Sequence, residues 1–300
     1  MNGWVRGIGL AMLALGLAGA ATVCAGTWLG ELKMARTIAV EVADMALPGD
    51  AASIAHGRYL FNTRGCATCH GRDGSGAAVI DDGAMRIVSP NITAGANSAI
   101  TRYRTLDWVR TLRHGVKPDG RPLMIMPSED YSLLSDADVG AIIAYVRQLA
   151  PVPGQAAQVR LPVAVKVMYA FGAVRDAAET IDHSAPPAPA TAPAVTIEHG
   201  AYVAHSCIGC HGENLTGGRI PGAPSAWPAP ANLTPGHGSA MTRYRTPESF
   251  MTMLRSGRRP DGSTISPVMP FGALGEMNEV DMRALHAYLQ SLPPRAGGQR

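Results

Sequence analysis

The chain has 300 residues, with 26 lysines and arginines against 23 aspartates and glutamates, so its formal net charge is +3. This net charge is modest, and the sequence has no basic stretch with interleaved aromatic residues, which is the pattern typical of nucleic-acid-binding proteins. The sequence therefore does not indicate binding to nucleic acid. The sequence also lacks the G-x-S-x-G and H-E-x-x-H patterns that mark common hydrolase active sites.

The first 30 residues contain an uncharged run from Gly7 to Gly30. A helix needs about 20 apolar residues to cross a bilayer, so residues 1–30 are predicted to form an N-terminal transmembrane anchor. A cleaved signal peptide is the alternative, because Ala18-Gly19-Ala20 offers a small-residue cleavage site. Arg6 precedes the run and predicts that the N-terminus stays in the cytoplasm, with the rest of the chain in the periplasm at a bacterial inner membrane.

Two copies of the string Cys-x-x-Cys-His lie at residues 66–70 and 207–211. This string is the attachment signature of c-type haem, in which two thiols bind one porphyrin and the histidine binds its iron. A thioredoxin-like redox pair does not need the histidine, and paired zinc knuckles usually lie about 15–20 residues apart, whereas these lie about 140 apart. We therefore predict two covalently bound haem c groups. The attachment residues would be Cys66, Cys69 and His70, then Cys207, Cys210 and His211.

The strings belong to a longer internal repeat. The segment His56-Gly57-Arg58-Tyr59 returns as His199-Gly200-Ala201-Tyr202, and Thr101-Arg102-Tyr103-Arg104-Thr105 returns unchanged at residues 242–246. Each copy spans about 100 residues, an ordinary size for a small domain. The sequence thus predicts one domain at residues 50–150 and a second at residues 196–293. His56 and His199 are expected to face solvent or make a packing contact rather than bind iron.

A Met-Pro pair follows each string at a similar distance. A haem iron that carries one histidine needs a second axial ligand to shuttle electrons without binding oxygen, and a methionine thioether can supply it. Proline fixes the backbone of the loop that would hold the thioether. Met126 and Met269 are the predicted second ligands, with Met124 as the alternative for the first haem.

Within each copy the expected secondary structure is helical. Apolar residues recur at helical spacing behind Ser135 and Asn278, which are suited to cap the last helix of each domain. Strand-like alternation is scarce, so both domains are predicted to be all-α. The expected helices cover residues 51–63, 106–113, 135–149, 195–204, 247–255 and 278–292.

Residues 151–195 form the predicted linker, which ends in a proline/alanine spacer at residues 184–193. Residues 161–173 of the linker are apolar with a single lysine. This segment is too short and too charged to be a second membrane span. It is expected to lie across a domain or to dock on a partner enzyme.

Each copy resembles a class I cytochrome c domain, with an N-terminal helix, the Cys-x-x-Cys-His string, a Met-Pro loop and a C-terminal helix. The Asn-x-Thr loop, the Thr-Arg-Tyr-Arg segment and the Pro-Asp-Gly turn are similar to those of the membrane-bound cytochrome c subunits of bacterial alcohol, aldehyde and gluconate dehydrogenases. Those subunits typically carry three haems, whereas this sequence has two strings. The resemblance implies two tandem, all-α cytochrome c domains behind a transmembrane helix.

The same resemblance implies a non-catalytic electron-transfer subunit of an oxidoreductase complex. Its expected partners are a periplasmic dehydrogenase subunit as electron donor and quinone or a terminal oxidase as acceptor. Two alternatives remain: a dihaem cytochrome c peroxidase, which needs an open iron position, and a dihaem subunit of a haem–copper oxidase. The matched Met-Pro loops argue against the peroxidase, because both irons would be closed.

Overall fold

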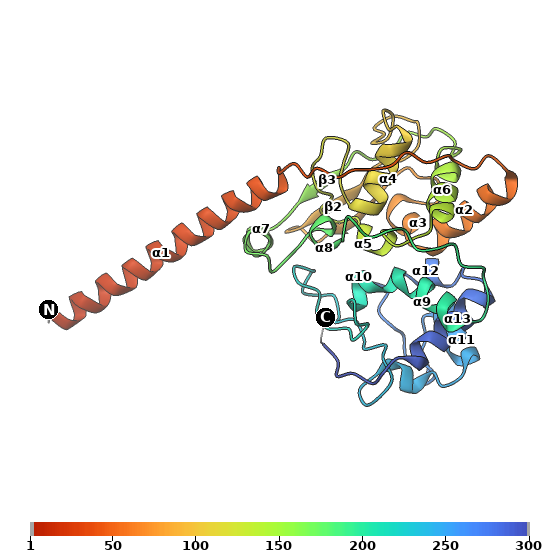
Figure 1. Cartoon of the computed structure of the whole chain (residues 1–300). Helices are drawn as coiled ribbons and strands as arrows, with labels where there is room; N and C mark the ends of the chain where they lie inside the picture. Colours follow the sequence, from red (N-terminus) through yellow and green to blue (C-terminus); the bar gives the residue numbers. More distant parts are fainter. Residues whose placement is uncertain (1–2, 299–300) are drawn as a thin grey trace.

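A long N-terminal helix projects from a body of two lobes (Figure 1). The structure is a computed structural model that describes residues 3–298. The projecting helix, α1 (Gly3–Met34), is continuous. The upper lobe in Figure 1 holds the first sequence repeat and the lower lobe holds the second. The predicted anchor is therefore a single helix, and its first two residues lie outside the described part of the chain.

Short polar side chains determine where the helices of the first lobe begin. Asp50 caps α2 by accepting a hydrogen bond from the Ser53 amide, and Ser135 caps α6 by accepting one from the Asp138 amide. Gly115 ends α4 in the left-handed region that favours glycine. The helices of this lobe are α2 (Ala51–Thr63), α3 (Cys66–His70), α4 (Thr105–His114), α5 (Ser128–Tyr131) and α6 (Asp136–Val146).

The second lobe repeats this order. Thr246 caps α11 with Pro247 in its first turn, and Asn278 caps α13, as predicted. Each predicted helix is present, with ends that agree to within about three residues. The elements are α9 (Ile197–Ala204), η1 (His205–Cys207), α10 (Ile208–His211), η2 (Ala240–Arg243), α11 (Pro247–Ser256), α12 (Phe271–Leu274) and α13 (Glu279–Ser291).

In each lobe the first and last helices cross closely at a glycine of the repeat. A Cβ atom on Gly57 would lie 2.0 Å from the carbonyl oxygen of Ala141, and one on Gly200 would lie 2.0 Å from that of Ala284. No side chain fits at such a distance, because protein interiors are already close-packed. The glycine of the His-Gly-x-Tyr segment therefore allows α2 to cross α6, and α9 to cross α13.

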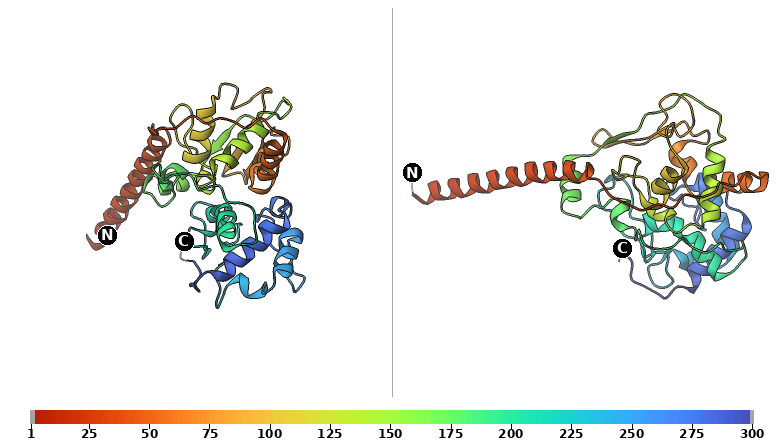
Figure 2. Two further views of the ribbon diagram at one scale, coloured as in Figure 1. Left: turned by 45° about the vertical axis from the view of Figure 1, so that its right-hand side comes forward. Right: turned by 45° about the horizontal axis from the view of Figure 1, so that its top comes forward.

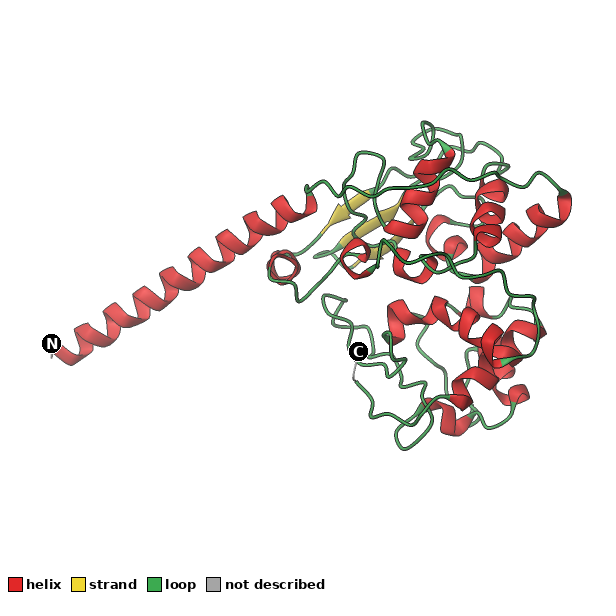
Figure 3. Cartoon of the chain, viewed as in Figure 1, coloured by secondary structure: helices red, strands yellow, loops and turns green. Residues whose placement is uncertain are grey.

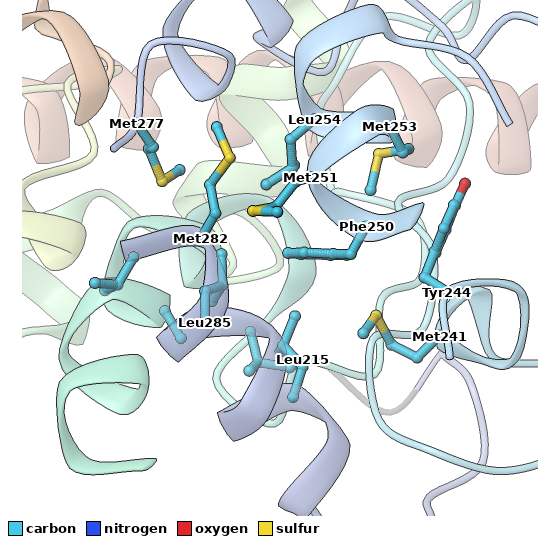
Figure 4. Close-up of a cluster of buried hydrophobic side chains, with 13 residues drawn as sticks. Leu215, Met241, Tyr244, Phe250, Met251, Met253, Leu254, Met277, Met282 and Leu285 are labelled. Atoms are coloured by element: carbon cyan, nitrogen blue, oxygen red, sulfur yellow. The ribbon is translucent and has the colours of Figure 1, made fainter. Parts of the chain in front are cut away.

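Each lobe has its own apolar core. The first contains Phe61, Trp108 and Ile143, among others. The second is rich in methionine (Figure 4), whose unbranched side chain fills irregular space. Its buried methionines are Met241, Met251, Met253, Met277 and Met282. Met269 lies at the margin of this core and is only partly buried.

The structure also contains a small sheet, which the all-α prediction did not include (Figure 3). Strands β1 (Ala77–Asp81), β2 (Arg86–Ser89) and β3 (Gln158–Arg160) pair antiparallel in that order. The β1–β2 hairpin is rich in β-branched residues. The strand β3 comes from the linker and pairs with a strand that is distant in the sequence, so no local sequence pattern indicates this pairing. The rest of the described chain is helical or irregular, in agreement with the predicted class.

The linker folds back on the first lobe and on the anchor. Helix α7 (Val163–Ala170) packs along α1, and α8 (Ala177–Thr180) contacts α5. Figures 1 and 2 show α7 beside the end of α1 that enters the body. The proline/alanine spacer has no regular secondary structure, as expected. The apolar segment of the linker therefore lies on the chain's own anchor, a contact that the sequence did not predict.

Candidate haem-binding sites

Each Cys-x-x-Cys-His string forms a short helical segment directly after the first helix of its lobe. The first string is α3, and the second spans the end of η1 and the whole of α10. A helical turn brings residues i and i+3 to the same face. In the described part of the chain, none of the five cysteines is paired in a disulfide. Both strings therefore keep the two thiols that haem attachment requires.

A backbone carbonyl orients the histidine of each string. The Nδ1 atom of His70 donates a hydrogen bond to the carbonyl oxygen of Pro90 at 2.9 Å, and that of His211 to the carbonyl oxygen of Ala231 at 2.7 Å. A carbonyl can only accept, so Nδ1 carries the proton and Nε2 is the nitrogen able to bind a metal. Iron-ligating histidines are usually held in this way.

The Asn-x-Thr loop fixes the carbonyl that orients each histidine. Asn91 directly follows Pro90, is buried, and donates hydrogen bonds to the carbonyl oxygens of Ala96 and Val152 at 2.9 and 2.8 Å. Its own Oδ1 accepts from the Thr93 amide at 2.8 Å. Asn232 makes the same turn with Thr234 in the second lobe. The repeated triplet thus holds the carbonyl group that orients each histidine ring.

The placement of the methionines favours Met126 over Met124. The Met126 side chain packs against the core of the first lobe, which Cys66 and Ala67 also contact. The Met124 side chain packs instead into a separate cluster with Met85 and the small sheet. Met269 packs against the second core, which Cys207 also contacts. The ligand assignment stays a prediction, and this packing supports it.

Burial sets the protonation of the candidate haem-binding groups. Desolvation raises the pKa of the Cys66 thiol and of the Cys207 thiol to about 12, and it lowers the pKa of His70. The His70 imidazole is therefore neutral at physiological pH, which is the form that binds iron. A His/Met haem c requires two thiols for attachment of the porphyrin, and an imidazole and a thioether as ligands of the iron. These groups lie near one core in each lobe.

The two candidate sites are neighbours across the boundary between the lobes. Helix α5, which begins just after Met126-Pro127, contacts η1 and α10 of the second string. Helix α12, which begins just after Met269-Pro270, contacts α3 of the first string. Each Met-Pro loop thus leads into a helix that touches the attachment helix of the other lobe.

Asp130 makes one of these contacts. Its Oδ1 accepts a hydrogen bond from the Gly209 amide, inside the second string, at 2.8 Å. Burial, with the nearby charge of Glu129, raises the pKa of Asp130 to about 8. The carboxyl group is therefore protonated over most of the physiological range, because the boundary between the lobes is too dry to favour its charge.

A reciprocal set of hydrogen bonds joins the lobes. Tyr59 of the first lobe donates to Asp281 at 2.7 Å, and Tyr202 of the second lobe donates to Asp138. The same tyrosine hydroxyls accept from the backbone amides of Asn278 and Ser135, the caps of α13 and α6. The lobes therefore meet through matched residues of the repeat, as in an isologous dimer.

The matched histidines contact the same two aspartates, each from within its own lobe. The Nε2 atom of His56 lies 2.6 Å from Asp138, and that of His199 lies 2.7 Å from Asp281. These two histidines thus make packing contacts, one of the two roles expected for them. Both His–Asp pairs span 82 positions, so the constant spacing in the two repeats was a signal that could have predicted the pairing.

Four of the unmatched histidines line a cavity or are buried. A cavity of about 970 Å³ between the lobes and the linker is lined by His114, His183 and His205, together with Ile208 of the second string. The Nδ1 atoms of His114 and His183 lie 3.0 Å apart, and burial lowers the pKa of His114 to about 4. His286 is buried with its Nε2 atom 2.8 Å from the Tyr244 carbonyl oxygen.

Comparisons with known proteins agree with the two-domain organisation. The family model of cytochrome c matches residues 54–150 and again residues 197–293. The chain is 27% identical over 270 residues to the fructose dehydrogenase cytochrome subunit of Gluconobacter japonicus, a match that covers 81% of this chain and 53% of that protein. It is 28% identical over 290 residues to a nicotinate dehydrogenase subunit of Pseudomonas putida, covering 89% of this chain and 24% of that protein.

One further similarity concerns a shorter stretch. The cytochrome c subunit of alcohol dehydrogenase (quinone) from Gluconacetobacter polyoxogenes is 37% identical over 98 residues, or 31% of this chain and 21% of that protein. The chain thus spans about half the length of the fructose dehydrogenase subunit and a smaller part of the other two.

Proposed function

Because this chain belongs to the cytochrome c family through two tandem domains, we propose that it is a membrane-anchored dihaem electron-transfer subunit. It would carry electrons from a periplasmic dehydrogenase to quinone or to a terminal oxidase. One observation carries the proposal: each domain presents an oriented histidine beside two cysteines that form no disulfide, with a Met-Pro methionine at the margin of the same core.

Cytochrome c domains carry covalently bound haem c, and the two strings would hold two such groups. Cys66 and Cys69 would hold one haem through thioether bonds, and Cys207 and Cys210 the other. His70 and His211 would be one axial ligand of each iron, with Met126 and Met269 as the other. When bound, haem c supplies a reversible one-electron iron centre.

The chain itself would tune and connect these centres. The Pro90 and Ala231 carbonyls fix the histidine rings and increase their basicity through the Nδ1 proton. The apolar cores exclude water from one side of each site. The contacts of α5 with α10 and of α12 with α3 bring the two sites together at the lobe boundary. Such proximity suits the passage of electrons through the chain.

The proposed electron donor is a dehydrogenase. The similar proteins are named as subunits of fructose, nicotinate and alcohol dehydrogenases, and the last name includes quinone. A quinone acceptor therefore ranks first, with a terminal oxidase as the second choice. The chain would act without a catalytic residue of its own.

The proposed location is the inner membrane, with both haem domains in the periplasm. Residues Gly7–Met34 form a helix that is long and apolar enough to span a bilayer, and none of its most apolar window is buried in the protein. The last turns of α1 are tied to the linker by packing and by the ion pairs of Glu31 and Lys33. These contacts give the helix a structural role, which favours an anchor over a discarded leader.

The axial ligands provide the sharpest test of the proposed function. We expect Met126→Leu and Met269→Leu each to remove about half of the far-red iron–sulfur charge-transfer band of the oxidised chain, because each deletes one of two thioether ligands. Met124→Leu is the matched control and should leave the band unchanged. Intact mass should report two haems on the unmodified chain.

The opposite results would change the assignment. Loss of the band in Met124→Leu would transfer the first ligand to that residue. A high-spin iron in the unmodified protein at rest, together with rapid turnover of peroxide, would overturn the electron-transfer role in favour of a peroxidase.

A further inference from the structure

Helix α7 packs against α1 at two glycines. A Cβ atom on Gly30 would lie 2.6 Å from the carbonyl oxygen of Lys166, and one on Gly26 would lie 3.1 Å from the Val167 side chain. These glycines form the spacing G-x-x-x-G, which lets helices approach closely inside membranes. Here α7 of the same chain covers both glycines, so this face of the anchor is not available to a second anchor helix.

Polar contacts fix the junction directly after the glycines. Lys33 donates to the Tyr169 carbonyl oxygen at 2.8 Å and forms an ion pair with Glu179 at 2.9 Å. Arg36 forms an ion pair with Asp176 at 2.8 Å. The Tyr169 and Asp176 side chains are buried within this cluster. The anchor and the linker therefore form one rigid elbow, and α1 is not a loose tether.

The outer face of this elbow is apolar and exposed. Phe171 is 63% exposed and Val163 is 51% exposed, at the two ends of α7. The Phe171 ring lies against α1, because a Cβ atom on Gly26 would be 3.2 Å from it. Trp28 and Leu32 of α1 are exposed nearby along the chain. The apolar surface of the anchor thus continues onto α7, and the ion pair of Lys166 with Glu31 lies beside it where the two helices meet.

We propose that α7 lies in the interfacial layer of the lipid bilayer, with Phe171 and Val163 inserted among the lipids. This proposal rests on the proposed role of α1 as an anchor. The level of α7 along α1 supports it, because α7 meets α1 at Gly26 and Gly30, inside the uncharged run, and the charged cluster begins only at Glu31. Aromatic residues such as Trp28 and Phe171 are typical of this layer.

A buried α7 would hold the first lobe in one orientation at the membrane surface. A single helix can rotate and tilt freely, whereas a helix with a second, interfacial element is constrained at two points. The lobe boundary, with its two haem strings, would then face the membrane at a fixed angle. The apolar segment of the linker would serve the lipid surface rather than a partner enzyme.

Photolabelling of the full, haem-loaded chain in phosphatidylcholine vesicles tests this placement. The vesicles carry a phosphatidylcholine with a diazirine in its acyl chain near the ester, and labelled tryptic fragments are identified by mass spectrometry. We expect label on fragment 7–33, which reports the anchor, and on fragment 167–175, which contains Phe171. Fragment 176–219, with the exposed Val195 and Ile197, should stay at background.

The labelling results distinguish the interfacial placement of α7 from the role of α1 as an anchor. Label on fragment 7–33 without label on fragment 167–175 would overturn the interfacial placement and leave the anchor intact. Absence of label from both would overturn the anchor as well. The variant Phe171→Asp should lose label on fragment 167–175 while keeping it on fragment 7–33, with an unchanged haem spectrum. Undiminished labelling of the variant would also overturn the proposal.

Discussion

Single buried titratable groups at the lobe boundary make the stability of the folded chain depend on pH. Asp130 is the clearest example, because its carboxyl group faces the backbone of the second haem string and is cut off from water. Burial raises its pKa to about 8, far above the usual value for aspartate. The folded chain therefore holds a proton on Asp130 that the unfolded chain releases near pH 4.

This raised pKa predicts a pH dependence of stability. The stabilisation from the Asp130 proton is complete below about pH 4 and is lost as the pH rises through about 8, at up to about 1.4 kcal/mol per pH unit. Asp130→Asn cannot titrate, yet its Oδ1 can still accept from Gly209. The Tm of the haem-loaded variant should therefore rise relative to that of the unmodified chain between pH 5 and pH 9.

Asp261→Asn is the matched control for this measurement. Hydrogen bonds from Ser263 hold the pKa of Asp261 below its usual value, so this group does not titrate between pH 5 and pH 9. Its Tm difference should stay constant over that range. A constant difference for Asp130→Asn would show that Asp130 is charged in the folded chain.

At the scale of the secondary-structure elements, each domain depends on the close crossing of its first and last helices. The crossing of α2 with α6 and that of α9 with α13 both depend on a glycine whose missing side chain leaves room for a carbonyl oxygen. In α2, the histidine of the same segment contacts Asp138 in the first turn of α6, and the tyrosine donates to Asp281 of the other lobe. The short segment His-Gly-x-Tyr thus contributes both to the helix crossing within each domain and to the contact between the lobes.

Gly57→Ala should weaken the first domain. The new methyl group would lie 2.0 Å from the Ala141 carbonyl oxygen, a backbone atom that cannot rotate away. Overpacking of this kind costs about 1–3 kcal/mol, so we expect a lower Tm by thermal melting. Gly272→Ala, in helix α12 with open space around its Cβ position, is the control and should match the unmodified chain. Equal Tm values for the two variants would contradict the close crossing.

At the scale of the whole molecule, the features that depend on local sequence patterns could be predicted, whereas those that depend on long-range contacts could not. Caps such as Ser135 and Asn278 act within three residues, and the two strings are contiguous, so their helices were predictable. The strand β3 pairs with a strand about 70 residues earlier, and Lys33 meets a carbonyl 136 positions away. No local pattern encodes such contacts, so the small sheet and the elbow were missed.

The aspartate-centred part of the contact between the lobes is symmetric except for one residue. Asp138 and Asp281 each accept from a tyrosine and pair with a histidine, but only Asp281 also pairs with an arginine, Arg64, at 2.6 Å. The Arg64 and Asp281 side chains are 4% and 3% exposed. Burial opposes the charge on Asp281, yet Arg64 and the other partners outweigh it and hold the pKa of Asp281 below its usual value.

This asymmetry predicts unequal effects of two matched substitutions. Asp138→Asn and Asp281→Asn both weaken the hydrogen bonds of one tyrosine and one histidine, but only Asp281→Asn leaves Arg64 as a buried, unpaired charge. Breaking such a pair costs about 3–5 kcal/mol, so Asp281→Asn should lower the Tm more and speed proteolytic cleavage of the linker. Adding Arg64→Met to Asp281→Asn should restore part of the loss, because it removes the unpaired charge. Equal Tm losses for the two single variants would mean that Arg64 reaches water when its partner is lost.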